Sequence, residues 1–149
     1  MERINLGKVA PELYQAVAEL DRLAMLRIKD AGIQDGFAHL LKLRASQINQ
    51  CAFCIRMHTQ DAIQSGESID RISLLNAWYE TEYYTLSERA ALKLIEGITH
   101  ITDHQLNDES YAQAHEVLSE QQISAIEWLA IVINTWNRIA ISSHYLVKP

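Results

Sequence analysis

The sequence predicts an all-α fold, organised as a single-domain bundle of six to eight helices. Its 149 residues include only 5 glycines and 2 prolines, too few for the closely spaced turns of a β-sandwich or barrel. Apolar residues instead recur at three- and four-residue spacing along most of the chain. The length suits one domain with a core of its own, and no internal repeat divides it.

The first half of the chain contains three predicted helices. Pro11 suits an early helical position, and helical spacing continues until Ala31-Gly32, which should end the helix. A second helix is predicted from about Asp35 to Ile48, with a break near Asn49-Gln50. The third starts at or just before Cys51 and continues to Gln64, where Ser65-Gly66 stops it.

Local signals also mark the elements of the second half. Ser68 to Trp78 is predicted as a shorter helix. Tyr79 to Thr85 is predicted as a connector, because its apolar residues follow no helical or strand period. Thr85-Leu86-Ser87-Glu88 is a capping box, in which the threonine hydroxyl and the glutamate carboxylate satisfy free amide donors at a helix start. The helix that it opens should run to about Ile101.

Two more helices complete the bundle. Asn107 or Asp108 can cap a helix that continues through Leu118. A second capping box, Ser119-Glu120-Gln121-Gln122, opens the last helix, which is predicted to reach about Ser143. Its apolar residues at helical spacing should pack inward.

Charge and hydropathy restrict the partners and the compartment. With 13 Lys+Arg against 19 Asp+Glu, the net charge is -6, and no basic cluster offers a surface for nucleic acid. No signal-peptide core occurs at the N-terminus. The longest apolar stretch, Ala125 to Ile133, is too short to span a bilayer and contains Glu127. We therefore expect a soluble, cytoplasmic protein without nucleic-acid or membrane partners.

The motif that carries chemistry is the Cys-x-x-Cys pair of Cys51 and Cys54, followed by His58. At about 100° per helical residue, Cys54 lies roughly 60° and His58 roughly 20° from Cys51 around the helix axis, so all three share one face. Residues at i and i+3 can form a disulfide, and His58, one turn beyond Cys54, can exchange a proton with its sulfur.

This spacing favours redox chemistry. A cysteine in the first turn of a helix meets aligned amide dipoles that stabilise the thiolate, and an imidazole can take its proton. Attack of the thiolate on a peroxide gives a sulfenic acid, which a second cysteine one turn away converts to a disulfide. Such a short loop would add little to stability, so a purely structural disulfide is disfavoured.

Three other interpretations compete with the redox motif. The two cysteines could be core filler, because cysteine is among the most buried residue types. They could bind structural zinc, although there is no second cysteine pair to complete the ligands. A thioredoxin-like fold is set aside, because that family places a cis-proline beside the cysteines, whereas the only prolines here are Pro11 and Pro149, and no strand pattern precedes Cys51.

The remaining polar and aromatic residues are expected either on the outer faces of helices or in the core. We expect Lys42 and Arg44 to lie away from the apolar face of their helix. Trp78, Trp128 and Trp136 are expected in the core or at subunit contacts. The other histidines are expected at the surface rather than at a metal site, and they are His100, His104, His115 and His144.

The segment from His39 to Ala62, HLLKLRASQINQCAFCIRMHTQDA, resembles the core motif of the alkylhydroperoxidase AhpD and carboxymuconolactone decarboxylase family. The resemblance extends to Glu88-Arg89-Ala90-Ala91-Leu92 and to Asn134-Thr135-Trp136-Asn137-Arg138, so it covers nearly the whole chain. It implies one AhpD-like all-α domain over residues 1–149, with the motif core at about 35–66, and assembly into a homo-oligomer, usually a trimer or hexamer.

The resemblance also implies roles for individual residues. Cys54 corresponds to the peroxidatic thiol, Cys51 to the resolving thiol and His58 to the proton-relay base. The decarboxylase branch lacks the cysteine pair, so its presence here favours thiol chemistry. Peroxidase members carry a glutamate where this chain has His39, twelve residues before the first cysteine. A histidine can shuttle protons near neutral pH, and His39 is therefore a candidate relay residue. Phe53 replaces a histidine between the cysteines.

Together these features predict a thiol-dependent hydroperoxide reductase, a peroxidase-type antioxidant enzyme with a redox-active disulfide. Its catalytic candidates are Cys54, Cys51, His58 and His39. Its partners would be a hydroperoxide substrate and an external dithiol reductant, with no bound organic cofactor and no metal expected. Two alternatives stay open: a disulfide oxidoreductase without peroxidase turnover, and a non-catalytic helical oligomer that binds a ligand or metal.

Overall fold

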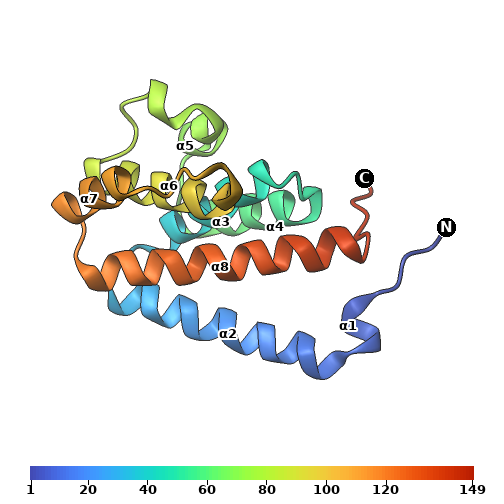
Figure 1. Ribbon diagram of the computed structural model, residues 1–149. Coiled ribbons are helices and arrows are strands. Elements are labelled where there is room, and N and C mark those ends of the chain that lie inside the picture. Colours follow the sequence, from blue (N-terminus) through green and yellow to red (C-terminus); the bar gives the residue numbers. More distant parts are fainter.

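The computed structural model describes residues 1–149 as eight α-helices and two short 3-10 segments without any strand (Figure 1). The all-α prediction is confirmed. The α-helices are α1 (Leu6–Val9), α2 (Pro11–Asp30), α3 (Asp35–Ile48), α4 (Ala52–Gln64), α5 (Ile69–Leu74), α6 (Leu86–Thr99), α7 (Asp108–Val117) and α8 (Glu120–Ser142). The 3-10 segments are η1 (Leu75–Glu80) and η2 (Ile101–Asp103).

Most of these helices start at side chains that accept a hydrogen bond from the first turn. Both predicted capping boxes are present, at Thr85 with Glu88 and at Ser119 with Gln122. Asn107 forms a third with Ser110. Each box satisfies amide donors that a helix start leaves free, which explains why α6, α7 and α8 begin where the sequence predicted.

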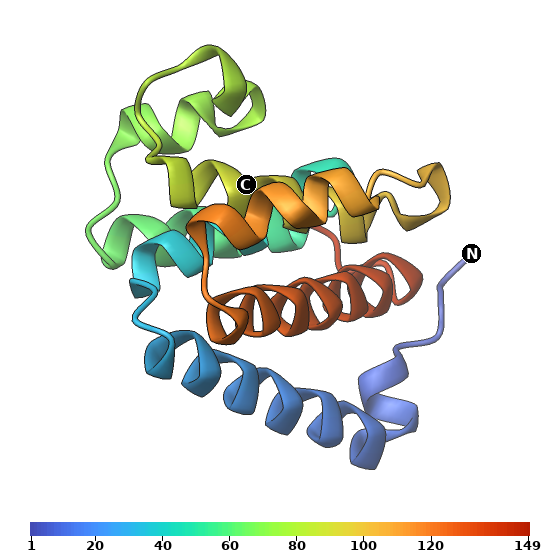
Figure 2. The same ribbon diagram turned by 60° about the vertical axis from the view of Figure 1, so that its left-hand side comes forward.

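Helix α8 is the centre of the bundle. It lies between α2 on one side and α3 and α6 on the other, and α4 packs against α3 (Figures 1 and 2). Because α8 has neighbours on several sides, most of its apolar positions are buried. Helix α2 covers one side only, so Ala24 and Ile28 are its only buried residues. The core therefore follows α8, α6 and α3.

The structure corrects the sequence prediction between Ser68 and Trp78. The helix ends at Leu74, and the chain continues as η1 with a kink at Ala77 (φ -126°, ψ 35°). Beyond the kink, Trp78 is buried and its indole N–H donates to Glu96 Oε1 over 2.8 Å. Burial of a tryptophan with its N–H satisfied thus outweighs continuation of the helix. Helix α1 was also not predicted.

Lys42 is a second correction. The sequence predicts that Lys42 lies away from the apolar face, but this residue is only 3% exposed in the structure. Its Nζ donates a hydrogen bond to Asp21 Oδ1 of α2 over 2.8 Å. The carboxylate allows the ammonium to be buried, because a buried charge requires a partner. Lys42 therefore ties α3 to α2 beside the site described below.

None of the helices combines the length and apolar character that a membrane-spanning segment needs.

Candidate thiol site

A tight turn between α3 and α4 positions the first cysteine. Asn49 ends α3, and Gln50 adopts a left-handed conformation with φ 55°. The amide of Gln50 donates to the Gln47 carbonyl and that of Cys51 to the Ser46 carbonyl, over 3.2 and 3.0 Å. These two bonds define a Schellman motif. The motif turns the chain so that Cys51 becomes the N-cap of α4.

Hydrogen bonds to α8 fix this turn. Asn49 Nδ2 donates to Asn134 Oδ1 and to Asn137 Oδ1, both over 2.9 Å. Asn137, which is fully buried, donates in turn to Ser46 Oγ over 3.0 Å. Asn134 and Asn137 belong to the C-terminal string of the family resemblance, which implied no role for either residue. Their partners lie more than 80 positions away, so spacing along the chain could not reveal them.

Cys51 and Cys54 form a disulfide in the structure, with their α-carbons 5.3 Å apart. The Cys51 sulfur also accepts a hydrogen bond from the amide of Cys54 over 3.4 Å. The predicted proximity of the pair is confirmed. Both residues are only 2% exposed, so a reactant must enter a cavity to reach either sulfur.

Cys54 lines a cavity of about 270 Å³ between α2, α4 and α8, which is partly open to solvent, and Cys51 is not among the residues that line it. Its lining is largely aromatic and apolar, and consists of Tyr14, Asp21, Phe53, Cys54, Met57, His58, Trp136, Ala140 and Tyr145. Tyr145 packs edge-on against Phe53, as does Tyr14 against Trp136. Cys54 and His58, which the sequence placed on one face, thus line the same cavity.

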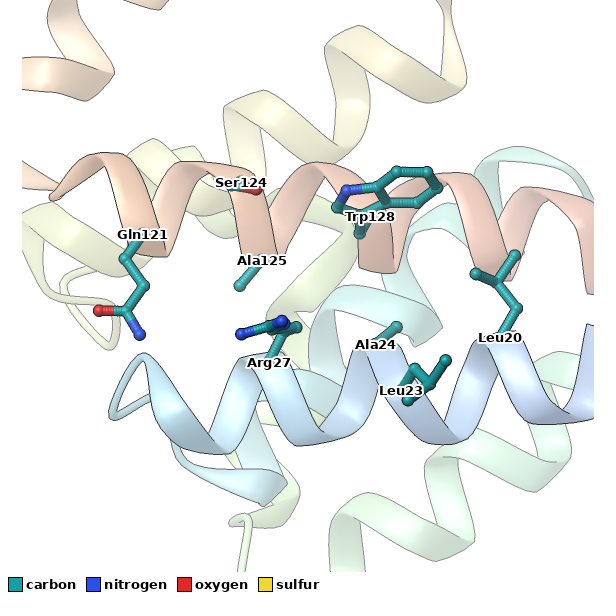
Figure 3. A pocket seen from close by; sticks show the side chains of 8 residues that line it. All are labelled: Leu20, Leu23, Ala24, Arg27, Gln121, Ser124, Ala125 and Trp128. Carbon is teal, nitrogen blue, oxygen red and sulfur yellow. The ribbon is translucent and has the colours of Figure 1, made fainter.

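The wider groove between α2 and α8 is chemically different (Figure 3). Its volume is about 400 Å³, and neither a thiol nor an imidazole is among its lining residues. Trp128 and Leu23 stand at its wall with Arg27 and Gln121 at one end (Figure 3). The smaller cavity at Cys54 is therefore the candidate site.

His58 is buried beside this cavity and lacks a hydrogen-bond partner at either ring nitrogen. Its Nδ1 faces Asp61 Oδ2 at 3.5 Å. Burial, with smaller contributions from the charges of Lys42 and His39, lowers the pKa of His58 to about 3. The imidazole is therefore neutral at physiological pH and has a free lone pair.

His39 lies on α3 next to His58. The two rings are stacked with centroids 5.9 Å apart and an angle of 25° between their planes. His39 Nδ1 lies 3.8 Å from the same Asp61 oxygen. Burial and the Lys42 ammonium lower the pKa of His39, while Asp61 and more distant carboxylates oppose this shift. The structure thus brings His39, His58 and the cysteine pair into one region.

Asp61 is the residue that sequence reasoning missed and could have found. It follows His58 by three residues on α4, which is the spacing of side chains that meet on one face. The pairing of Lys42 with Asp21 could not be predicted from spacing along the chain, because it joins two different helices. Asp21 also accepts the indole N–H of Trp136 over 3.0 Å, so it connects α2, α3 and α8 beside the cavity.

The other histidines lie outside this region. His104, His115 and His144 are exposed, as predicted. His100 is partly exposed and has Nδ1 3.4 Å from Asp103 Oδ2. The only group of three potential metal ligands consists of His39, His58 and Asp61.

Comparisons with known proteins concern the sequence and the fold. A model of the carboxymuconolactone decarboxylase family matches residues 11–97, which include the cysteine pair and both site histidines. The chain is 38% identical over 141 residues to the uncharacterized protein YdfG of Bacillus subtilis (strain 168), covering 95% of this chain and 93% of that protein. It also resembles the crystal structure of ATU0492 from Agrobacterium tumefaciens, with a TM-score of 0.89 and 35% identity over 100% of this chain and 99% of that one. ATU0492 is a protein of unknown function that is provisionally named an antioxidant defence protein, AhpD.

Proposed function

Since the chain belongs to the carboxymuconolactone decarboxylase family, we propose that it is a thiol-dependent hydroperoxide reductase of the AhpD type. The observation that carries the proposal is the position of Cys54, whose side chain lines a cavity together with His58 and lies within bonding distance of Cys51. A peroxidatic thiol needs this combination of a substrate space, a proton acceptor and a resolving thiol.

The first step is attack by the Cys54 thiolate on the terminal oxygen of a hydroperoxide. A sulfur–oxygen bond forms and the oxygen–oxygen bond breaks, which oxidises Cys54 to a sulfenic acid and reduces the hydroperoxide to an alcohol. The alcohol oxygen takes the proton that Cys54 had passed to His58. Cys51 then attacks the Cys54 sulfur, so that a disulfide forms and water leaves. An external dithiol exchanges with the disulfide and restores both thiols.

Local charges support formation of the thiolate. Cys54 is the third residue of α4, where the helix dipole favours negative charge. The low pKa of His58 belongs to the disulfide state, in which the sulfur carries no charge. In the reduced protein a Cys54 thiolate would favour the imidazolium and raise the pKa of His58, because an opposite charge stabilises the protonated ring.

Asp61 supplies the negative charge that a histidine at position 39 cannot. Its carboxylate lies 3.5 Å from His58 Nδ1 and 3.8 Å from His39 Nδ1. In this proposal His58 is the catalytic base, and His39 and Asp61 act through it as positioning residues. The relay therefore has a carboxylate, but one contributed by α4 rather than α3.

A homo-oligomer, either a trimer or a hexamer, is part of the proposal. Large apolar side chains on α2 and α8 are exposed, including Leu13 at 65%, Leu23 at 46%, Trp128 at 48% and Ile131 at 43%. Coverage by a second copy of the chain would remove this apolar surface from water.

The experiment that tests the function follows hydroperoxide consumption by the reduced protein with a dithiol donor, in the presence of a chelator. Cys54→Ser should reduce the rate to background, while Cys51→Ser, assayed with no dithiol donor present, should complete at most one turnover. His58→Ala should lower the rate at least tenfold. The exposed His115→Ala is the matched control and should keep the rate of the wild type. Full activity of Cys54→Ser would contradict the assignment.

Disulfide exchange without peroxide turnover is the second candidate, because the same Cys51–Cys54 disulfide supports it. The two functions differ in their first step. An exchange enzyme would oxidise a dithiol donor stoichiometrically yet leave added hydroperoxide unconsumed. Both functions require a dithiol to reach this buried disulfide, so consumption of the hydroperoxide is the measurement that separates them.

A further inference from the structure

Three imidazole nitrogens are the only buried side-chain nitrogen or oxygen atoms of the protein without a hydrogen-bond partner. They are His39 Nδ1 and both ring nitrogens of His58. Leaving a buried polar atom unpaired costs about 1–3 kcal/mol, so folded proteins rarely do so. Neutral His58 has a single lone pair, so the proton transfer proposed above and an ion bound at Nδ1 belong to different states of the protein. The two Nδ1 atoms both face Asp61 at 3.5 and 3.8 Å but form no hydrogen bond with it.

The arrangement of these atoms matches a metal site. The two Nδ1 atoms lie 3.5 and 3.8 Å from Asp61 Oδ2, and one donor atom from each of the three residues lies within 4.8 Å of the others. Zinc binds imidazole nitrogen and carboxylate oxygen at about 2.0–2.2 Å, so tetrahedral ligands are separated by about 3.3 Å. Small side-chain rotations would bring all three donors to an ion placed between them.

We propose that His39, His58 and Asp61 bind a divalent transition-metal ion, of which Zn²⁺ is the best match. Two imidazoles and one carboxylate are a ligand set typical of sites that keep a further position open for water or another ligand. The donors come from α3 and α4, which pack closely against each other, so the fold holds them together before any ion arrives.

The surrounding charges permit a cation here. The Lys42 ammonium of α3 is the lysine or arginine charge that acts on both histidines, and Asp21 of α2 pairs with it over 2.8 Å. Asp61 itself provides one negative ligand, and Asp35 at the start of α3 adds a further carboxylate whose charge acts on His39.

The ion has a route to the site that does not pass through the core. The side chains of His39 and Asp61 are 18% and 36% exposed, whereas that of His58 is 5% exposed. An ion could therefore meet Asp61 and His39 first and His58 last. The cysteines are not required, since their sulfurs are joined to each other in the oxidised protein.

The test is titration of the chelator-treated, disulfide-form protein with ZnCl₂ by calorimetry and with CoCl₂ by absorption spectroscopy. The oxidised form prevents thiolates from binding the probe. We expect one ion per chain and Co²⁺ bands without sulfur charge transfer. His39→Phe, which keeps a ring but removes the donor, and Asp61→Asn should each weaken binding at least tenfold.

His100→Phe is the matched control, because His100 also lies one turn from an aspartate, with Nδ1 3.4 Å from Asp103 Oδ2. This variant should bind Zn²⁺ as tightly as the wild type. The proposal is overturned if the wild type binds no ion, or if His39→Phe and Asp61→Asn bind as tightly as the wild type does. Circular dichroism of each variant identifies loss of folding, and because Asp61 is partly exposed, Asp61→Asn should keep the fold. The readout is binding, so the result is independent of peroxidase activity.

Discussion

Cys51 and Cys54 are equally buried but have different surroundings. Cys54 lines the aromatic cavity, whereas Cys51 is the N-cap of α4 and does not reach that space. This difference supports the roles that the family resemblance implied, with Cys54 meeting the substrate and Cys51 resolving. The spacing of the two cysteines alone could not assign these roles, because either sulfur can attack the other.

His58 should make stability depend on pH. An unfolded histidine titrates near 6.5, whereas burial, Lys42 and His39 lower the pKa of folded His58 to about 3. Between these values the unfolded state binds more protons, so the free energy of unfolding is greatest above about pH 6.5 and decreases as the pH falls. The contribution of His58 to this slope is at most about 1.4 kcal/mol per pH unit.

Urea unfolding of metal-free, oxidised protein between about pH 7 and about pH 4 measures this effect. His58→Phe keeps a buried ring and should show a shallower decrease than the wild type. Carboxylates such as Glu88, whose pKa is also lowered, contribute equally to both proteins. Equal slopes for the two proteins would contradict a neutral, buried His58.

The turn between α3 and α4 shows how one element positions the thiols. Asn137 of α8 accepts from Asn49 and donates to Ser46, although it is fully buried. Asn137→Ala removes both bonds and leaves buried polar groups unpaired. We expect the free energy of unfolding to fall by about 1–3 kcal/mol.

The exposed Asn76, which accepts from Arg44 over 2.8 Å, is the control for this change. Asn76→Ala should alter stability by less than about 0.5 kcal/mol. Chemical denaturation of both variants compares them directly. Similar effects at the two positions would mean that the buried network does not stabilise the turn specifically.

Most element boundaries could be predicted because their signals are local. The predicted bounds of α3, Asp35 to Ile48, match the structure, and the capping boxes fixed the starts of α6 and α8. The predicted helix end was wrong where it depends on a residue far away in the sequence. The helix ends at Leu74 rather than Trp78 because Trp78 pairs with Glu96 on α6, which no local pattern records.

At the scale of the whole molecule, the sequence identified residues that lie close together along the chain better than those that meet only in the fold. Cys51, Cys54 and His58 belong to one motif, and His39 was found by its position in the family pattern. The aromatic wall of the cavity is different. Tyr14, Trp136 and Tyr145 come from both ends of the chain, so only the packing of α2 and α8 with the C-terminal segment reveals them.

The exposed apolar surface of α2 and α8 leads to a prediction about assembly. Trp128 is 48% exposed at the wall of the groove between these helices (Figure 3). Light scattering after size exclusion should find a homo-oligomer for the wild type and smaller species for Trp128→Glu, because a buried charge without a partner is unfavourable. The control, Gln64→Glu at an exposed position of α4 rather than of α2 or α8, should keep the oligomer. A monomeric wild type would contradict the assembly.

The central claim is that a hydroperoxide oxidises Cys54 directly. Intact-protein mass spectrometry after one equivalent of an organic hydroperoxide is added to reduced, metal-free protein tests it. The wild type should lose two hydrogen atoms as the Cys51–Cys54 disulfide forms. Cys51→Ser should gain one oxygen atom, localised to Cys54 by a sulfenic-acid trap, and Cys54→Ser should remain unchanged. If the wild type stays reduced, or if Cys54→Ser is oxidised as fast as Cys51→Ser, the protein is not a Cys54-dependent peroxidase.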